Sequence, residues 1–180
     1  RFQLVFSLAL TGWGMYYLVS TIFPHLDQKS KRKACLVASI FYMMNPFVIY
    51  WMYLGVYPYF SLVALPFTFT FVFKGLKASK QSGEWIKYAI LTAFSSTVLL
   101  TFHAEVSLLI IAFFSLYATY YLAADLYSHQ LHTLTAHLKF FFVAASMSFF
   151  VNLWWLLPSI QSYDGTISSM IAHSSIKRVE

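Results

Sequence analysis

The sequence predicts an all-α fold, a polytopic transmembrane helical bundle of about six spans. Of its 180 residues, 59% are hydrophobic and 10% are charged, whereas an ordinary soluble domain is roughly half apolar and a quarter charged. Long uncharged runs alternate with short basic clusters. Aromatic residues make up 21% of the chain, which suits lipid-facing helices with aromatic belts at both membrane interfaces. These observations argue against a soluble globular domain.

The net charge of +6 indicates membrane topology and not nucleic-acid binding, because the basic residues lie between apolar runs. The single cysteine, Cys35, excludes an internal disulfide framework and most cysteine-based metal sites. The sequence also contains no nucleotide-binding loop, no Gly-rich dinucleotide fingerprint and no Gly-x-Ser-x-Gly elbow. The usual chemistry of soluble enzymes therefore has no sequence support.

The first three spans follow from the lengths of two uncharged runs. Residues 2–26 suffice for one helix, since about 20 residues cross the hydrocarbon core of a bilayer. Residues 34–73 form a run of 40 residues, about twice the required length, so this run must turn back on itself. Gly55 and Pro58 place the turn among Tyr and Trp residues that suit an interface.

The next two spans share a single segment, residues 88–124, which is 37 residues long and too long for one tilted helix. Glu105 interrupts it. A last uncharged run covers residues 140–163. We therefore expect a transmembrane domain over residues 1–161, and the start of an extracytoplasmic loop at 162–180. The predicted spans are about 4–23, 35–54, 56–74, 86–103, 105–123 and 139–158.

The distribution of Lys and Arg predicts the orientation of the bundle. Nine of the twelve fall on one side of the predicted membrane, and three, Arg1, Lys177 and Arg178, fall on the other. The positive-inside rule assigns the side with nine to the cytoplasm. The cytoplasmic loops are then 25–34, 74–87 and 125–138.

His103 and Glu105 are the candidate catalytic residues. Glu105 is the only fully charged side chain between Lys87 and Asp125, and an unpaired carboxylate at hydrocarbon depth costs several kcal/mol. A break between two helices would bring both side chains to a wet outer boundary. A hydrated turn without function is one interpretation. Phosphate binding, ligation of a divalent metal and general acid/base catalysis are the others.

Four further residues are candidates for binding a lipid or a sugar. Asn45 precedes Pro46 in the middle of a predicted span, where we expect a kink and a hydrogen bond from the Asn45 amide to a neighbouring helix. Asn152, Trp154 and Trp155 lie near the outer end of the last span. The two indoles suit an interfacial belt, and they could also stack on a sugar or a lipid head group.

Three histidines, His129, His132 and His137, follow Asp125 in a polar segment. His129 and His132 share one face of a helix, but His137 is five residues further on and Asp125 is the only carboxylate nearby in the sequence. We therefore interpret this segment as a solvated cytoplasmic loop, and we assign no metal site.

Three stretches resemble the GT-C superfamily of membrane glycosyltransferases, in particular its YfhO-like and arabinofuranosyltransferase-like members. "SIFYMMNPFVIYWMYLGVYPYFSLVALPFTFTFVFKGLK" resembles a helix pair of this family, with an aromatic first helix and a proline-containing second helix. "TFHAEVSLLI" is similar to an outer turn that carries a histidine, and "NLWWLLPSI" is similar to the end of a later span.

The resemblance implies transfer of a sugar from a polyprenyl-phosphate donor on the non-cytoplasmic face of the plasma membrane. It also implies that the usual catalytic acid lies upstream of these residues, so we expect a fragment that is inactive alone and depends on other parts of the protein or on partner subunits. The lipid bilayer is a further expected partner, and nucleic acid is not. The alternatives are a transporter or flippase, and a noncatalytic subunit of a membrane complex.

Overall fold

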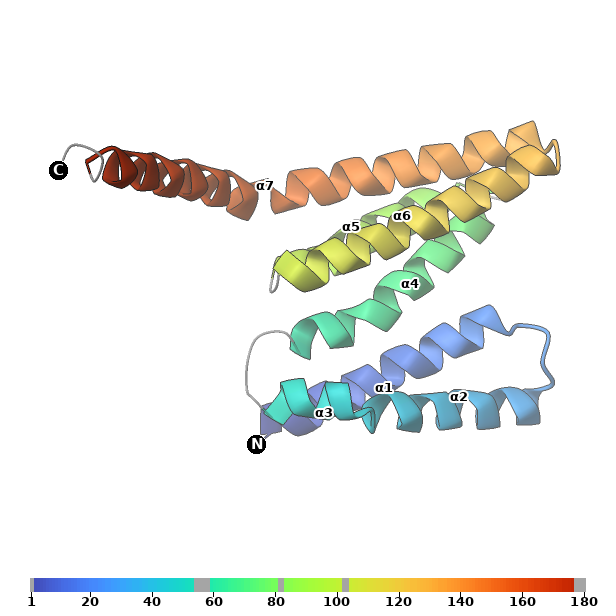
Figure 1. The fold of residues 1–180 in the computed structure, drawn as a ribbon. Coiled ribbons are helices and arrows are strands. Elements are labelled where there is room, and N and C mark those ends of the chain that lie inside the picture. Colours follow the sequence, from blue (N-terminus) through green and yellow to red (C-terminus); the bar gives the residue numbers. More distant parts are fainter. Residues whose placement is uncertain (1, 54–58, 81–82, 102–103, 177–180) are drawn as a thin grey trace.

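The structure, a computed structural model, describes residues 2–53, 59–80, 83–101 and 104–176. All regular secondary structure in these ranges is helical, which confirms the predicted all-α class (Figure 1). The helices are α1 (Phe2–Ile22), α2 (Gln28–Met43), α3 (Pro46–Tyr53), α4 (Tyr59–Ser79), α5 (Trp85–Thr101), α6 (Ala104–Tyr127) and α7 (Leu131–Ile176).

The helices run up and down through the bundle, and α4 lies at its centre. Helix α4 packs against α1 and α5, and α5 packs against α7. Figure 1 shows that α1, α4 and α6 end on the same side of the bundle, where α2, α5 and α7 begin. The three segments predicted to be cytoplasmic therefore lie at one end of the molecule, which we call the basic end.

Three helical stretches are long and apolar enough to cross a membrane, within the part of the chain that the structure describes: Gln3–Ile22, Phe60–Ser79 and Leu131–Trp154. This is fewer than the six predicted spans. The second predicted span is divided between α2 and α3, which have 16 and 8 residues, and α5 has 17. Helix α6 has 24 residues, but the side chains at 104–110 lie outside the described part.

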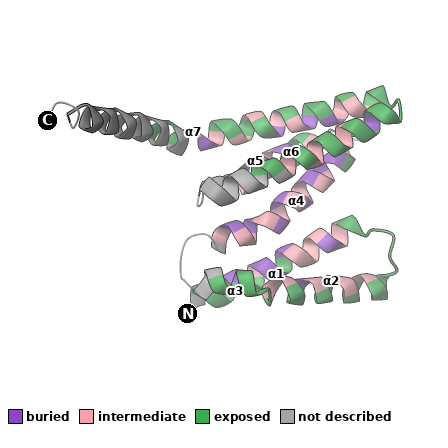
Figure 2. Ribbon diagram, viewed as in Figure 1, coloured by how far each residue is buried: buried purple, intermediate pink, exposed green. Residues whose placement is uncertain are grey.

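Exposed residues occur along most of the helices (Figure 2), and many of them are large and apolar. Phe41 is 76% exposed, Phe142 is 74% exposed and Trp13 is 63% exposed. Large exposed apolar surfaces are rare on soluble monomers and mark contact with lipid or protein. The surface is thus consistent with a membrane protein.

Several helices are longer than the spans predicted from hydropathy. Helix α2 begins at Gln28, inside the expected loop 25–34, and α4 continues to Ser79. Helix α7 has 46 residues, about 70 Å at 1.5 Å per residue, and it is helical to Ile176, where a loop was expected at 162–180. Hydropathy measures the length of an apolar run, whereas a helix can continue into water beyond it.

Asp27 explains why α2 starts within a basic segment. Its carboxylate accepts hydrogen bonds from the backbone N–H groups of Lys29 and Ser30, at 3.1 and 3.0 Å. This satisfies two of the four N–H groups that a helix leaves unpaired at its N-terminus. The bond from Ser30 holds the pKa of Asp27 below its ordinary value, so the cap persists until the pH falls through that lowered pKa.

A tight turn joins α6 to α7. The N–H of Gln130 donates to the carbonyl of Asp125 at 3.0 Å, and the N–H of His129 donates to that of Leu126 at 3.1 Å. This pair of bonds is a Schellman motif, which requires a left-handed residue at its centre. His129 takes that conformation, with a φ of 54°. The turn starts α7 only four residues after α6 ends, alongside the last turn of α6.

The proline in α4 is compensated from another helix. Pro66 has no N–H, so the carbonyl of Leu62, four residues earlier, loses its helical partner. The hydroxyl of Tyr42 in α2 donates to this carbonyl at 3.0 Å. Gly14 of α1 gives the proline room, because a Cβ atom there would lie 2.9 Å from Cγ of Pro66.

The largest core cluster lies where α4, α5 and α7 meet, and it contains Val72, Leu76, Ala89, Phe140 and Ala144. Phe140 is fully buried against Gly75, where an added Cβ atom would overlap the phenyl ring. Small residues at such positions let helix backbones approach closely, which is how helices associate in lipid. Gly75 therefore forms a notch that receives Phe140.

We predict that single cysteines at Ser30, Gly83 and Ser128, all exposed positions at the basic end, will react from one side of the membrane. A cysteine at Tyr57 is expected to react from the other side. The background is Cys35→Ala, since the native cysteine is buried, and the measurement is labelling with an impermeant maleimide in oriented vesicles. Labelling of positions 30 and 83 from opposite sides would contradict the topology.

We also predict that Tyr42→Phe will lower the free energy of unfolding by about 1–3 kcal/mol, because it leaves the partly buried carbonyl of Leu62 unpaired. The loss should be smaller in a Pro66→Ala background, where residue 66 regains an N–H that can bond to Leu62. Thermal unfolding in detergent measures both effects, with Tyr120→Phe as an exposed control. An equal loss in both backgrounds would show that the hydroxyl does not replace the helical bond.

Candidate functional site

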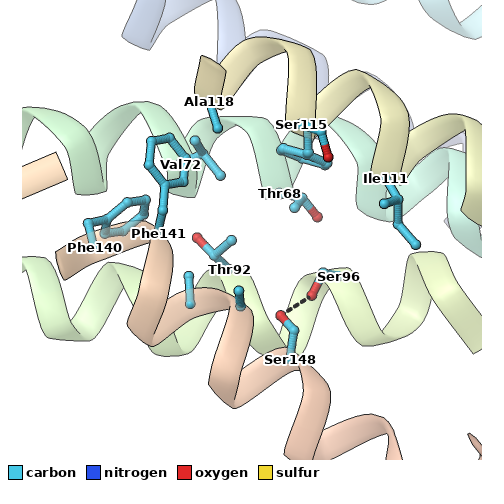
Figure 3. A pocket seen from close by; sticks show the side chains of 13 residues that line it. Thr68, Val72, Thr92, Ser96, Ile111, Ser115, Ala118, Phe140, Phe141 and Ser148 are labelled. Carbon is cyan, nitrogen blue, oxygen red and sulfur yellow. Dashed lines mark hydrogen bonds between the residues drawn. The ribbon is translucent and has the colours of Figure 1, made fainter. Parts of the chain in front are cut away.

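An apolar cavity of about 300 Å³ lies between α4, α5, α6 and α7 (Figure 3). Its walls include Val72 from α4, Ile111 and Ala118 from α6, and Phe141 from α7. The volume is at the lower end of the range for ligand pockets, roughly 300–1,000 Å³. A cavity with these walls suits a hydrocarbon chain.

Four hydroxyl groups at the cavity, those of Thr68, Thr92, Ser96 and Ser148, are engaged with protein atoms. Thr68 donates to the carbonyl of Ala64 and Thr92 donates to that of Tyr88, at 3.0 and 2.7 Å. The hydroxyls of Ser96 and Ser148 bond to each other at 2.8 Å, across α5 and α7 (Figure 3). These contacts leave mainly carbon exposed to a ligand.

Asn152, predicted from the sequence as a binding residue, extends this polar contact between α5 and α7. It is 1% exposed, and its Nδ2 donates to the Ser148 carbonyl at 2.6 Å and to the Thr97 hydroxyl at 3.3 Å. A buried amide with these bonds fixes the position of α7 on α5. In the structure Asn152 thus acts between helices, one turn beyond the cavity.

Among the predicted residues whose side chains the structure describes, Asn45 and Trp154 are not gathered with Asn152. Asn45 lies at the break between α2 and α3, and its Oδ1 accepts from the N–H of Phe47 at 2.9 Å. The expected bond to a neighbouring helix is therefore wrong, because Asn45 caps α3, whose first residue is Pro46. Trp154 is 66% exposed on α7. The side chain of Trp155 lies outside the described residues.

The predicted catalytic pair falls near the junction of two described helices, since α5 ends at Thr101 and α6 begins at Ala104. His103 lies outside the described residues. Glu105 belongs to α6, but its side chain is also outside the described part. The roles predicted for the two residues remain predictions.

Sequence reasoning missed a buried pair, Asp125 and His137. His137 is fully buried and Asp125 is 7% exposed, and His137 Nδ1 bonds to Asp125 Oδ2. The interpretation of this segment as a solvated loop is wrong for His137, because α7 begins at Leu131 and packs the imidazole against α6. The signal in the sequence was that Asp125 is the only acid between 106 and 163.

No three His, Cys, Asp or Glu side chains lie close enough to hold a metal ion, among the residues whose side chains the structure describes. Because the side chains of His103 and Glu105 are not among them, the divalent metal considered from the sequence is untested. The chain itself matches no protein-family model, no curated protein and no solved structure. The resemblance to GT-C glycosyltransferases therefore stays a prediction.

We predict that Asp125→Asn and His137→Gln will each destabilise the protein by about 1–3 kcal/mol, because each leaves a buried partner poorly paired. The double variant should lose less free energy of unfolding than the two single variants lose together, since the residues are in direct contact. Thermal unfolding in detergent measures the coupling. Strictly additive losses would show that the pair contributes nothing as a pair.

Proposed function

We propose that this chain is part of an integral membrane glycosyltransferase that takes a sugar from a polyprenyl-phosphate donor on the non-cytoplasmic face. The observation that carries the proposal is the apolar cavity between α4, α5, α6 and α7. An isoprenoid chain is a branched hydrocarbon without polar atoms, and it requires a site of this chemistry. The family resemblance of the sequence supplies the reaction.

The position of the cavity agrees with this assignment. Ile111 lines it and lies seven residues after Ala104, which is about 10 Å along a helix axis. A lipid chain in the cavity can therefore extend toward the break between α5 and α6, where His103 and Glu105 fall in the sequence. At that boundary the imidazole would donate to a phosphate oxygen, and the carboxylate would act as a general base toward the acceptor hydroxyl.

A transporter or flippase is the second candidate, and the Asp125–His137 pair favours it. Ionisable side chains that are buried together in a helical bundle commonly mark the path of an ion or a proton. The pair lies at the basic end, away from the break between α5 and α6. The two functions thus depend on different residues, which allows them to be separated by mutation.

We predict that filling the cavity will block binding of the donor. Ala118→Phe places a ring in the cavity, whereas Ala123→Phe places the same ring at an exposed position of the same helix. A polyprenyl phosphate with a photoreactive diazirine in its second isoprene unit should label the wild type and the control, and it should label Ala118→Phe at least roughly tenfold less. Equal labelling of all three proteins would remove the cavity from the proposal.

We further predict that Glu105→Gln and His103→Ala will reduce sugar transfer far more than folded yield, when measured with the protein in its native membrane and its lipid donor. Asp125→Asn should lower stability but leave the turnover of folded protein near that of the wild type. The reverse pattern, with lipid or ion movement lost in Asp125→Asn and unchanged in Glu105→Gln, would favour the transporter. Unchanged turnover in Glu105→Gln and His103→Ala would leave a hydrated turn as their only role.

A further inference from the structure

A second cavity, of about 720 Å³, lies at the basic end of the bundle. It is bordered mainly by the C-terminal halves of α1 and α4, with contributions from α2, α6 and α7. Four lysines line it: Lys31 from α2, Lys74 and Lys77 from α4, and Lys80, which directly follows α4. His25 also lines it, and no carboxylate is among the lining residues. We call it the basic cavity.

Two of the acids near this region, Asp27 and Asp125, are already engaged, since Asp27 caps α2 and Asp125 bonds to His137. A third, Glu84, follows Lys80 by four residues, but it is exposed and does not line the cavity. Lys74 is half-buried, and its Nζ contacts the hydroxyl of Tyr17 and lies 4.0 Å from the centre of the Tyr17 ring. A tyrosine holds a lysine in place but leaves its positive charge uncompensated. Several like charges around one cavity favour the binding of an anion.

The wall of the basic cavity also contains an unsatisfied polar atom. His137 lines the cavity and is fully buried, and its Nδ1 is occupied by Asp125. Its Nε2 has no hydrogen-bond partner among the residues that the structure describes. Buried polar atoms are nearly always paired in native structures, and an orphan calls for an explanation. Because Nε2 is itself buried, a ligand in the cavity reaches it only if the side chains around the imidazole move.

We propose that the basic cavity binds a phosphate group. Lysine is an effective ligand for phosphate as a point charge, and the lining of the cavity contains four lysines and no carboxylate. The phosphate has two sources, the head group of an anionic lipid and free phosphate in solution. Apolar side chains border the cavity together with the lysines, namely Ile22, Phe73 and Leu76, as an acyl chain beside a head group requires.

The site is distinct from the proposed donor site, because the two cavities share no lining residue. Its failure would leave the glycosyltransferase proposal unchanged.

The test compares two double variants that each remove two exposed lysines from the basic end. Lys77→Gln/Lys80→Gln changes the cavity, whereas Lys29→Gln/Lys33→Gln changes lysines that do not line it. Native mass spectrometry in detergent measures the binding of dioleoyl phosphatidic acid and, as a neutral reference, dioleoyl phosphatidylcholine. Thermal unfolding confirms that both variants are folded.

We predict that wild type and the Lys29/Lys33 variant bind phosphatidic acid in preference to phosphatidylcholine. The Lys77/Lys80 variant should bind phosphatidic acid roughly thirtyfold more weakly, since each lysine near an anionic head group contributes a factor of about five. Equal losses in both variants would show that only net charge matters and would overturn the proposal. Wild type without a preference for the anionic lipid would overturn it as well.

A second arm identifies the source of the phosphate. Inorganic phosphate is titrated against bound phosphatidic acid at constant ionic strength, with chloride as the reference anion. Displacement of the lipid and a raised melting temperature indicate a site for free phosphate, whereas retention of the lipid indicates a head-group site. Either result supports phosphate binding only if the Lys77/Lys80 variant does not show it. The same displacement or retention of the lipid in that variant would count against the proposal.

Discussion

The hydrogen bond from Tyr42 to the carbonyl of Leu62 meets a constraint that governs the whole bundle. A bilayer core contains no water to pair with a backbone carbonyl, so each one must find its partner within the protein. Pro66 removes the helical partner of the Leu62 carbonyl, and the hydroxyl of Tyr42 from another helix replaces that partner. The buried hydroxyls follow the same rule in α4, where Thr68 and Thr70 each bond to the carbonyl four residues earlier.

Polar contacts between helices also pair groups that would otherwise be buried without a hydrogen-bond partner. Ser96 with Ser148, Thr97 with Asn152, and Asp125 with His137 connect α7 to its neighbours in three places. Each contact pairs groups that would be costly to bury alone. Between these contacts α7 lines the apolar cavity mainly with carbon atoms. The basic cavity, in contrast, is lined by four lysines. The bundle thus offers hydrocarbon between its helices and positive charge at one end.

The sequence predicted the helical class, because this class depends on composition and on the length of apolar runs. The helix ends were less accurate, since hydropathy does not register a polar cap such as Asp27. Asn45 was assigned to the wrong partner because its bond to Phe47 depends on the exact residue at which α3 begins. The Asp125–His137 pair required the left-handed turn at His129, and the two cavities required the packing of helices distant in the sequence.

The notch at Gly75 has a consequence for how the protein is made. Phe140 fills this notch, but it belongs to α7, which leaves the ribosome well after α4 and α5. Until α7 enters the membrane, Val72, Leu76 and Ala89 lack the ring that covers them. The core between α4 and α5 is therefore completed only when α7 is inserted, and a chain that stopped at the turn after α6 would keep this gap open to lipid or to another protein's helix.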